Sequence, residues 1–187
     1  MFGVCTLRKP YAIVMEFYGV DGKCVTIQKA AQHNLLGQQE TWAGTLQQCC
    51  EAVNHLHSQG YVHGDLKGDN ILFHHTDNHY HPVIIDFGKM AKMECMTKYK
   101  LSSSAQHKYR RYYPHIAPEV VRGTHPKSPK SDIYSLGMVF SLICHHSVFE
   151  QLKQVAAKCI HEFPEERPDL ERVITDLSHI SLGDGYF

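Results

Sequence analysis

The stretch His63-Gly-Asp-Leu-Lys-Gly-Asp-Asn70 and the triplet Asp86-Phe-Gly88 decide the fold of this chain. Between them, apolar residues at 71–73 and 83–85 flank a polar, histidine-rich segment at 74–81. This pattern predicts a strand, a turn and a second strand. The histidines are attributed to a solvated turn rather than to a metal site. The hairpin would bring Asn70 and Asp86 close together, so both could bind one metal cluster.

The residue types in this stretch suit phosphoryl transfer. That reaction needs a carboxylate that orients a hydroxyl group, oxygen ligands for magnesium and a cation beside the phosphate that moves. Asp65 can supply the carboxylate, and Lys67 can supply the cation. Asn70 and Asp86 can supply the oxygen ligands, so one short stretch holds all the required groups.

The same residues resemble the catalytic loop and the magnesium-binding segment of the eukaryotic protein kinase family. The family writes its catalytic loop H-R-D-x-K-x-x-N, and this chain keeps every position except the arginine, which is Gly64. Further sequence features of the family follow in the expected order, at 117–119 (Ala-Pro-Glu), at 131–137 (Ser-Asp-Ile-Tyr-Ser-Leu-Gly) and at Arg167. The resemblance covers nearly the whole chain.

The resemblance implies a role for each site residue. ATP and Mg²⁺ are the implied cofactors, and a protein is the implied substrate. Asp65 would be the catalytic base, and Lys67 would bind near the transferred phosphate. Asn70 and Asp86 would bind the metal together with the nucleotide. Glu16-Phe17-Tyr18 would be the hinge whose backbone meets the adenine.

The resemblance also assigns structural roles to a further set of residues, which comprises His63, Phe87, Gly88, Glu119, Asp132 and Arg167. His63 would pack on Phe87, and Asp132 would hold the backbone of the catalytic loop. Glu119 and Arg167 would form a buried ion pair, in which losing one partner would cost roughly 3–5 kcal/mol.

The expected fold class is α+β: a protein-kinase-like fold with a mainly helical C-terminal lobe and short β-hairpins. Residues 1–187 would form one partial kinase domain. Residues 1–19 predict two short strands and resemble a remnant of the N-terminal lobe, which would otherwise be truncated. Residues 20–187 would be the helical lobe. The 187 residues contain no Gly-rich phosphate loop and no strand lysine of the V-A-I-K type.

Apolar periodicity predicts helices over residues 24–36, 41–60, 131–144, 152–160 and 170–177. Thr41 and Asp169 are the expected caps of the second and the last of these helices. The helix over 131–144 is apolar almost all round, which is typical of a buried helix. Cys49 and Cys50 are expected to be buried thiols.

Residues 89–113 are rich in basic and hydroxyl side chains and would be the activation segment of the family. Two interpretations stay open: a phosphorylation switch, in which a phosphate pairs with a basic side chain, or a mobile, solvated loop. Gly64 replaces the arginine that would receive such a phosphate. Lys67 is the residue that serine/threonine kinases usually carry at its position, which favours Ser or Thr over Tyr as the acceptor.

Composition limits the partners and the compartment. Nineteen basic and nineteen acidic residues cancel, so no net charge favours nucleic acid or a membrane surface. The seven cysteines are scattered, and no signal pattern or membrane-length apolar run is evident, which favours a cytoplasmic or nuclear protein. Without a small lobe, the top of the helical lobe would expose apolar surface that a protein partner could cover.

Three functions are compatible with these observations. The chain could be a protein kinase that transfers the γ-phosphate of ATP to a protein hydroxyl, with weak or no activity in isolation because the phosphate loop and the strand lysine are lacking. It could be an inactive kinase-like binding module. It could also be a fragment of a longer active kinase.

Overall fold

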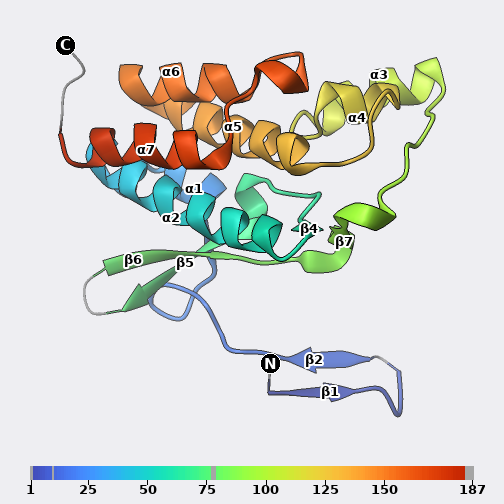
Figure 1. Cartoon of the computed structure of the whole chain (residues 1–187). Helices are drawn as coiled ribbons and strands as arrows, with labels where there is room; N and C mark the ends of the chain where they lie inside the picture. The colour runs from blue at the N-terminus through green and yellow to red at the C-terminus, as the bar shows by residue number, and fades with distance from the viewer. Residues whose placement is uncertain (1, 10, 77–78, 184–187) are drawn as a thin grey trace.

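The computed structural model describes residues 2–9, 11–76 and 79–183. A helical body lies above one β-hairpin, and a second hairpin at the N-terminus stands away from both (Figure 1). The fold is therefore α+β, as the sequence predicts, and both hairpins lie on one side of the helices (Figure 1).

The helical body is built around four helices, which are α2 (Gln39–Ser58), α5 (Pro129–His146), α6 (Glu150–Cys159) and α7 (Leu170–Ser181). Helix α2 packs along α7, and α5 packs along α6. Three further helices flank them, which are α1 (Ile27–Gln32), α3 (Ser103–Tyr112) and α4 (Pro118–Arg122). Within the described residues, no helix is both long enough and apolar enough to span a bilayer.

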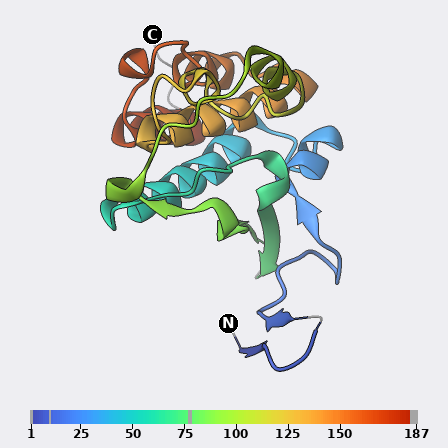
Figure 2. The same cartoon turned by 90° about the vertical axis from the view of Figure 1, so that its right-hand side faces the viewer.

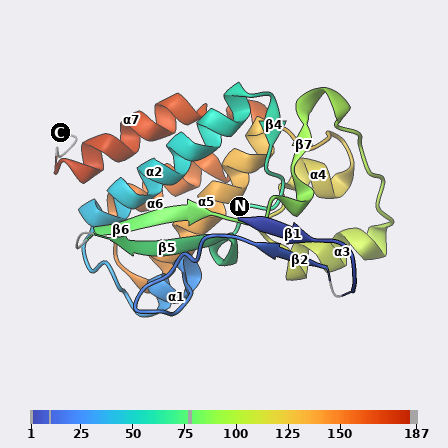
Figure 3. The ribbon, with the colours of Figure 1, turned by 90° about the horizontal axis from the view of Figure 1, so that it is seen from below.

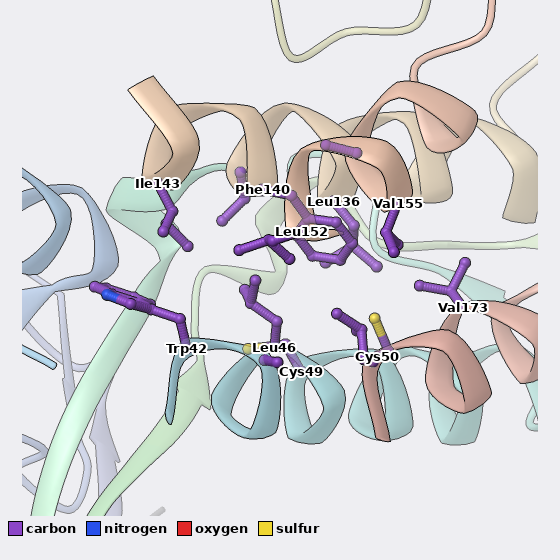
Figure 4. Close-up of a cluster of buried hydrophobic side chains, with 14 of the residues drawn as sticks. Trp42, Leu46, Cys49, Cys50, Leu136, Phe140, Ile143, Leu152, Val155 and Val173 are labelled. Carbon is purple, nitrogen blue, oxygen red and sulfur yellow. The ribbon is translucent and has the colours of Figure 1, made fainter. Parts of the chain in front are cut away.

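The core lies between these four helices (Figure 4). Trp42 and Leu46 of α2 face Leu136 and Phe140 of α5, with Leu152 of α6 between them. Each of these five side chains is at most 1% exposed. Burying one such side chain contributes about 1.5–3 kcal/mol to folding, so this layer holds the body together.

The hairpin predicted around residues 71–85 is present. Strands β5 (Ile71–Thr76) and β6 (His79–Ile84) pair antiparallel, with Ile71 opposite Ile84. Strand β3 (Val25–Thr26) adds to the other edge of β5. Seen from below, the hairpin lies across α2 (Figure 3).

The predicted turn of this hairpin was too long. Pairing continues beyond the apolar runs through His74 opposite His81 and His75 opposite Tyr80. Backbone hydrogen bonds can extend a ladder over polar residues once the apolar part has set its register. Residues 77 and 78 of the predicted turn lie outside the described residues.

Two further strand pairs are present. Strands β1 (Gly3–Cys5) and β2 (Ala12–Val14) pair as predicted for residues 1–19 and lie apart from the helices (Figure 2). Strand β4 (Tyr61–Val62) pairs with β7 (Ala91–Lys92), so the two strands flank the stretch that decides the fold. Single 3₁₀ turns complete the chain: η1 (Gly68–Asn70), η2 (Phe87–Lys89), η3 (Met93–Cys95) and η4 (Pro164–Glu166).

Several helix boundaries differ from the predictions. Helix α1 is shorter than 24–36, because the two residues before it pair with β5 and the Thr26 side chain caps it. Thr41 is not a cap, since α2 begins two residues earlier at Gln39. Asp169 does cap α7, and its side chain accepts a hydrogen bond from the Arg172 amide at 2.8 Å.

The segment 89–113 contains a helix that the sequence interpretation missed. Helix α3 starts after Ser102, whose hydroxyl accepts a hydrogen bond from the Ala105 amide at 3.3 Å. A serine cap followed by basic and polar residues forms a solvated helix without a buried stripe. Apolar periodicity gives no signal for such a helix.

Candidate active site

The loop that carries Asp65 is anchored on the first turn of α5. Asp132 is fully buried. It accepts hydrogen bonds from the His63 amide at 2.8 Å and from the Gly64 amide at 2.9 Å. His57 Nε2 lies 2.9 Å from the same carboxylate. The predicted contact of Asp132 with the loop backbone is therefore confirmed, whereas His57 was not anticipated.

Cationic and polar groups surround the Asp65 carboxylate. Lys89 Nζ lies 2.9 Å and His115 Nε2 lies 3.3 Å from Oδ1. Lys67 Nζ and Asn70 Nδ2 each lie 3.5 Å from Oδ2. Burial alone would raise the pKa of Asp65, but the hydrogen bonds from Lys89 and His115 and the charge of Lys67 hold this pKa below its ordinary value. Asp65 is therefore ionised at neutral pH.

The β5–β6 hairpin joins Asn70 to the segment that leads to Asp86. The Ile85 amide donates to Asn70 O at 2.9 Å, directly beyond the last strand pair. The Asn70 side chain donates to Asp65 O at 2.9 Å, which ties the hairpin to the catalytic loop. Asp65, Asn70 and Asp86 thus lie at one end of the hairpin, as the sequence predicts.

Asp86 has an unusual backbone. Its φ is +63°, a conformation uncommon for residues other than glycine but tolerated by Asp and Asn. Its exposed carboxylate accepts a hydrogen bond from the Gly88 amide at 3.3 Å. Backbone of this kind often occurs where a side chain must be aimed for function.

The groups present at this end of the hairpin fit magnesium. Asn70 uses its amide nitrogen on Asp65, and its Oδ1 has no hydrogen-bond partner among the described residues. Asp86 adds a carboxylate oxygen. In the described part of the chain, this site included, no three His, Cys, Asp or Glu side chains gather around a common point. Magnesium is usually held by one or two protein oxygens, with phosphates and water completing its shell, so two ligands suffice.

The structure shows how the chain accommodates glycine in place of arginine in the loop. Gly64 has a φ of +74°. Lys127 reaches over it, and its ammonium donates to Gly64 O at 2.8 Å. Burial lowers the pKa of Lys127. No sequence signal identified Lys127, because it lies outside every motif.

The structural residues meet as predicted. The His63 and Phe87 rings lie 5.2 Å apart between centroids. Arg167 donates to both oxygens of Glu119, at 2.8 and 2.7 Å, and both side chains are at most 2% exposed. This bidentate pair links α4 to the loop before α7.

The proposed hinge lies at the other end of the hairpin. Glu16 and Phe17 are exposed, and the Tyr18 hydroxyl donates to Glu16 at 3.1 Å. The Tyr18 ring meets the edge of His74 in β5, at 5.4 Å between centroids. The backbone oxygen of Tyr18 also accepts a hydrogen bond from the Cys24 thiol. Among the described residues, no hydrogen bond or ring contact joins residues 16–18 to Asp65 or to the side chains that contact it.

The sequence is similar to known proteins over most of its length. The family described as "Protein kinase domain" matches residues 1–178. GLH-binding kinase 1 of Caenorhabditis elegans is 33% identical over 116 residues, which is 62% of this chain and 27% of that protein. Calcium-dependent protein kinase 5 of Plasmodium berghei is 32% identical over 122 residues, or 65% of this chain and 20% of that protein.

A third relative matches more of the chain at lower identity. Human tyrosine-protein kinase TXK is 27% identical over 95% of this chain, which corresponds to 37% of its own length. The chain therefore spans roughly a fifth to two fifths of the length of these relatives.

Proposed function

The chain belongs to the protein kinase family, and we propose that it transfers the γ-phosphate of ATP to a hydroxyl group of a protein. One observation carries the proposal: the ionised Asp65 carboxylate, the Lys67 ammonium and the Asn70 side chain lie together at the end of the β5–β6 hairpin from which Asp86 follows. Asn70 links them, because it bonds to Asp65 through its side chain and to Ile85 through its backbone.

Each group has a distinct task in this proposal. Asp65 accepts a hydrogen bond from the acceptor hydroxyl and orients its oxygen. Lys67 Nζ lies 3.5 Å from Asp65. It places a positive charge where the phosphoryl group passes from the oxygen of ATP to the oxygen of the acceptor hydroxyl. Asn70 and Asp86 hold magnesium, which supplies charge neutralisation for the phosphates.

The acceptor hydroxyl is proposed to belong to Ser or Thr. Lys67 supports this choice. The similarity to a protein named as a tyrosine kinase makes Tyr the second candidate. Three synthetic peptides of one sequence, with Ser, Thr or Tyr as the only hydroxyl, distinguish the two. Faster labelling of the Tyr peptide would contradict the proposal for Ser and Thr.

Nucleotide binding is tested by thermal denaturation with Mg²⁺ and ATP. A ligand that binds only the native state raises the apparent stability by mass action. The melting temperature should rise with ATP in the presence of Mg²⁺ and should not rise in Asp86→Asn, which keeps a residue type tolerant of positive φ. An equal rise in both proteins would contradict the assignment of Asp86 as a metal ligand.

Phosphotransfer is tested with labelled ATP and the same peptides. Asp65→Asn removes the proton acceptor and should lower kcat by about 10²–10⁴-fold. Binding of nucleotide without transfer in the wild type would instead support the second candidate function, a binding module. Exposed apolar side chains beside the site, such as Phe87 at 48% exposure, favour that alternative.

The proposed compartment is the cytoplasm or the nucleus. All seven cysteines are free thiols, which supports a reducing environment. Fluorescence microscopy of the tagged protein tests this proposal, and accumulation in the secretory pathway would contradict it.

A further inference from the structure

The two oxygens of the Asp65 carboxylate have different environments. Oδ1 receives Lys89 at 2.9 Å and His115 at 3.3 Å, so both of its lone pairs are engaged. Oδ2 has Lys67 and Asn70 only at 3.5 Å, at the limit of a hydrogen bond. The carboxylate is thus held by one oxygen while the other keeps acceptor capacity.

The backbone of His115 is fixed by the same helix that fixes the catalytic loop. The Ser135 hydroxyl of α5 donates to His115 O at 2.7 Å. Ser135 lies one helical turn beyond Asp132, which holds the amides of His63 and Gly64. The first two turns of α5 therefore anchor both the loop that carries Asp65 and the segment that carries its partner.

The chemistry of the pair defines its proton. An ionised carboxylate can only accept, so the proton lies on His115 Nε2. The His115 side chain is 12% exposed. Burial lowers the pKa of His115, and the Asp65 carboxylate partly opposes this effect. At neutral pH, His115 is therefore an uncharged donor to Oδ1.

An open groove lies beside two of the side chains that contact Asp65. Lys67 and His115, which both contact Asp65, line a groove of about 340 Å³ together with Gln28, Pro114 and Leu142. Lys67 contacts Oδ2 at 3.5 Å, so a hydroxyl that enters the groove beside Lys67 approaches the oxygen that keeps acceptor capacity.

We propose that His115 is a positioning residue of the active site: with Lys89 it occupies Oδ1 of Asp65 and leaves Oδ2 to receive the acceptor hydroxyl. The inference rests on the proposed function. It names the oxygen of Asp65 that receives the acceptor hydroxyl, and the residue that keeps this oxygen available.

Kinetics of two matched variants test the role in turnover. His115→Gln keeps an N–H donor of similar reach, and His115→Leu keeps similar volume without a donor. The Leu variant should lose about tenfold to a hundredfold in kcat, the range expected for one hydrogen bond to a charged group. Its KM for ATP should not change, and the Gln variant should recover most of the rate. Equal rates in the Leu variant and the wild type would overturn the proposal, as would equal losses in both variants.

A second measurement does not need catalysis. The His115 imidazole signals are assigned in NMR spectra of the 187-residue chain by their loss in His115→Gln, and are then titrated without metal or nucleotide. The charged groups that face His115 are Asp65, Lys67 and Lys89. The Tyr113 ring lies 6.3 Å away, and His145 lines the same groove. Asp65→Asn should lower the pKa of His115, and Lys89→Met should raise it.

The outcomes separate the two hypotheses. An unchanged His115 pKa in both variants would show that the contact does not exist and would overturn the inference, whether or not the protein is active. The predicted pKa changes in a protein that neither binds Mg²⁺ and ATP nor transfers phosphate would support the arrangement of the carboxylate and would reject the proposed function.

Discussion

At the scale of single residues, Gly64 has a left-handed backbone, and atoms of Lys127 and Lys89 lie close to its Cα. A Cβ at this position would lie 2.8 Å from Lys127 Nζ and 3.0 Å from the Lys89 carbonyl oxygen. Gly60 has a φ of +80° with no atom within 4 Å of such a Cβ. Because positive φ costs a non-glycine residue about 1–2 kcal/mol, Gly60→Ala should lose about that much stability. Gly64→Ala should lose more, since its neighbours must also move.

Urea denaturation of both glycine variants measures the difference. The gap between the two losses isolates the effect of Lys127 and Lys89, because the backbone penalty is common to both. Equal losses of stability in the two variants would mean that Lys127 and Lys89 move away from the new methyl group at no cost in free energy.

The Glu119–Arg167 pair offers a second prediction at this scale. Arg167→Met should destabilise the protein by roughly 3–5 kcal/mol, because it leaves the Glu119 carboxylate buried without its partner. Arg122→Met is the matched control. Arg122 pairs with Glu162, which is 52% exposed, and an exposed pair contributes at most about 1 kcal/mol. Similar losses in the two variants would contradict the importance assigned to burial.

The contacts that were predicted from the sequence involve residues in motifs. Glu119 with Arg167, and Asp132 with the loop at His63, were each expected because both partners lie at recognisable positions. His115 and Lys127 were missed. Their roles depend on which segments, distant in the sequence, pack against Asp65 and Gly64. The spacing of apolar residues does not predict such contacts between loops.

At the scale of elements, periodicity identified the buried helices and missed the solvated one. Helices α2, α5, α6 and α7 each present apolar residues to the common core, and the sequence pattern reports that burial directly. Helix α3 has no buried residue, so it leaves no such pattern. The strands of the β5–β6 hairpin extend beyond their apolar runs because pairing, not burial, sets their ends.

Helix α2 buries two adjacent cysteines, because it packs against α7 and β6 and also contacts α5. Burial raises the pKa of Cys49 to about 12 and the pKa of Cys50 well above its ordinary value. The thiolate is the reactive form, so neither should be alkylated at pH 8 in the folded protein. Exposed Cys24 and Cys95 should react.

Mass spectrometry after a timed exposure to iodoacetamide locates the modified thiols. The control is the same treatment in concentrated urea, where the buried cysteines should react as the exposed ones do. Modification of Cys49 at the rate of Cys95 in the folded protein would contradict the packing of α2.

At the scale of the whole molecule, the β1–β2 hairpin packs little against the other elements. Its strands pair with each other, and exposed apolar side chains such as Val4 and Ile13 show that little packs against them. An isolated two-stranded hairpin is marginally stable in water. Hydrogen exchange should therefore be fast at residues 3–5 and 12–14 and slow along α5. Comparable protection in both regions would contradict this difference.

Nucleotide should change that pattern in a way that tests the hinge. Adenine bound by Glu16, Phe17 and Tyr18, with phosphates near Asn70 and Asp86, would connect the two ends of the β5–β6 hairpin. Mg²⁺ and ATP should therefore slow exchange at residues 16–19 as well as at 69–71, and Asp86→Asn should weaken both effects. Protection at 69–71 alone would mean that the phosphates bind while the adenine lies elsewhere. That result would reject the hinge assignment and leave the metal site in place.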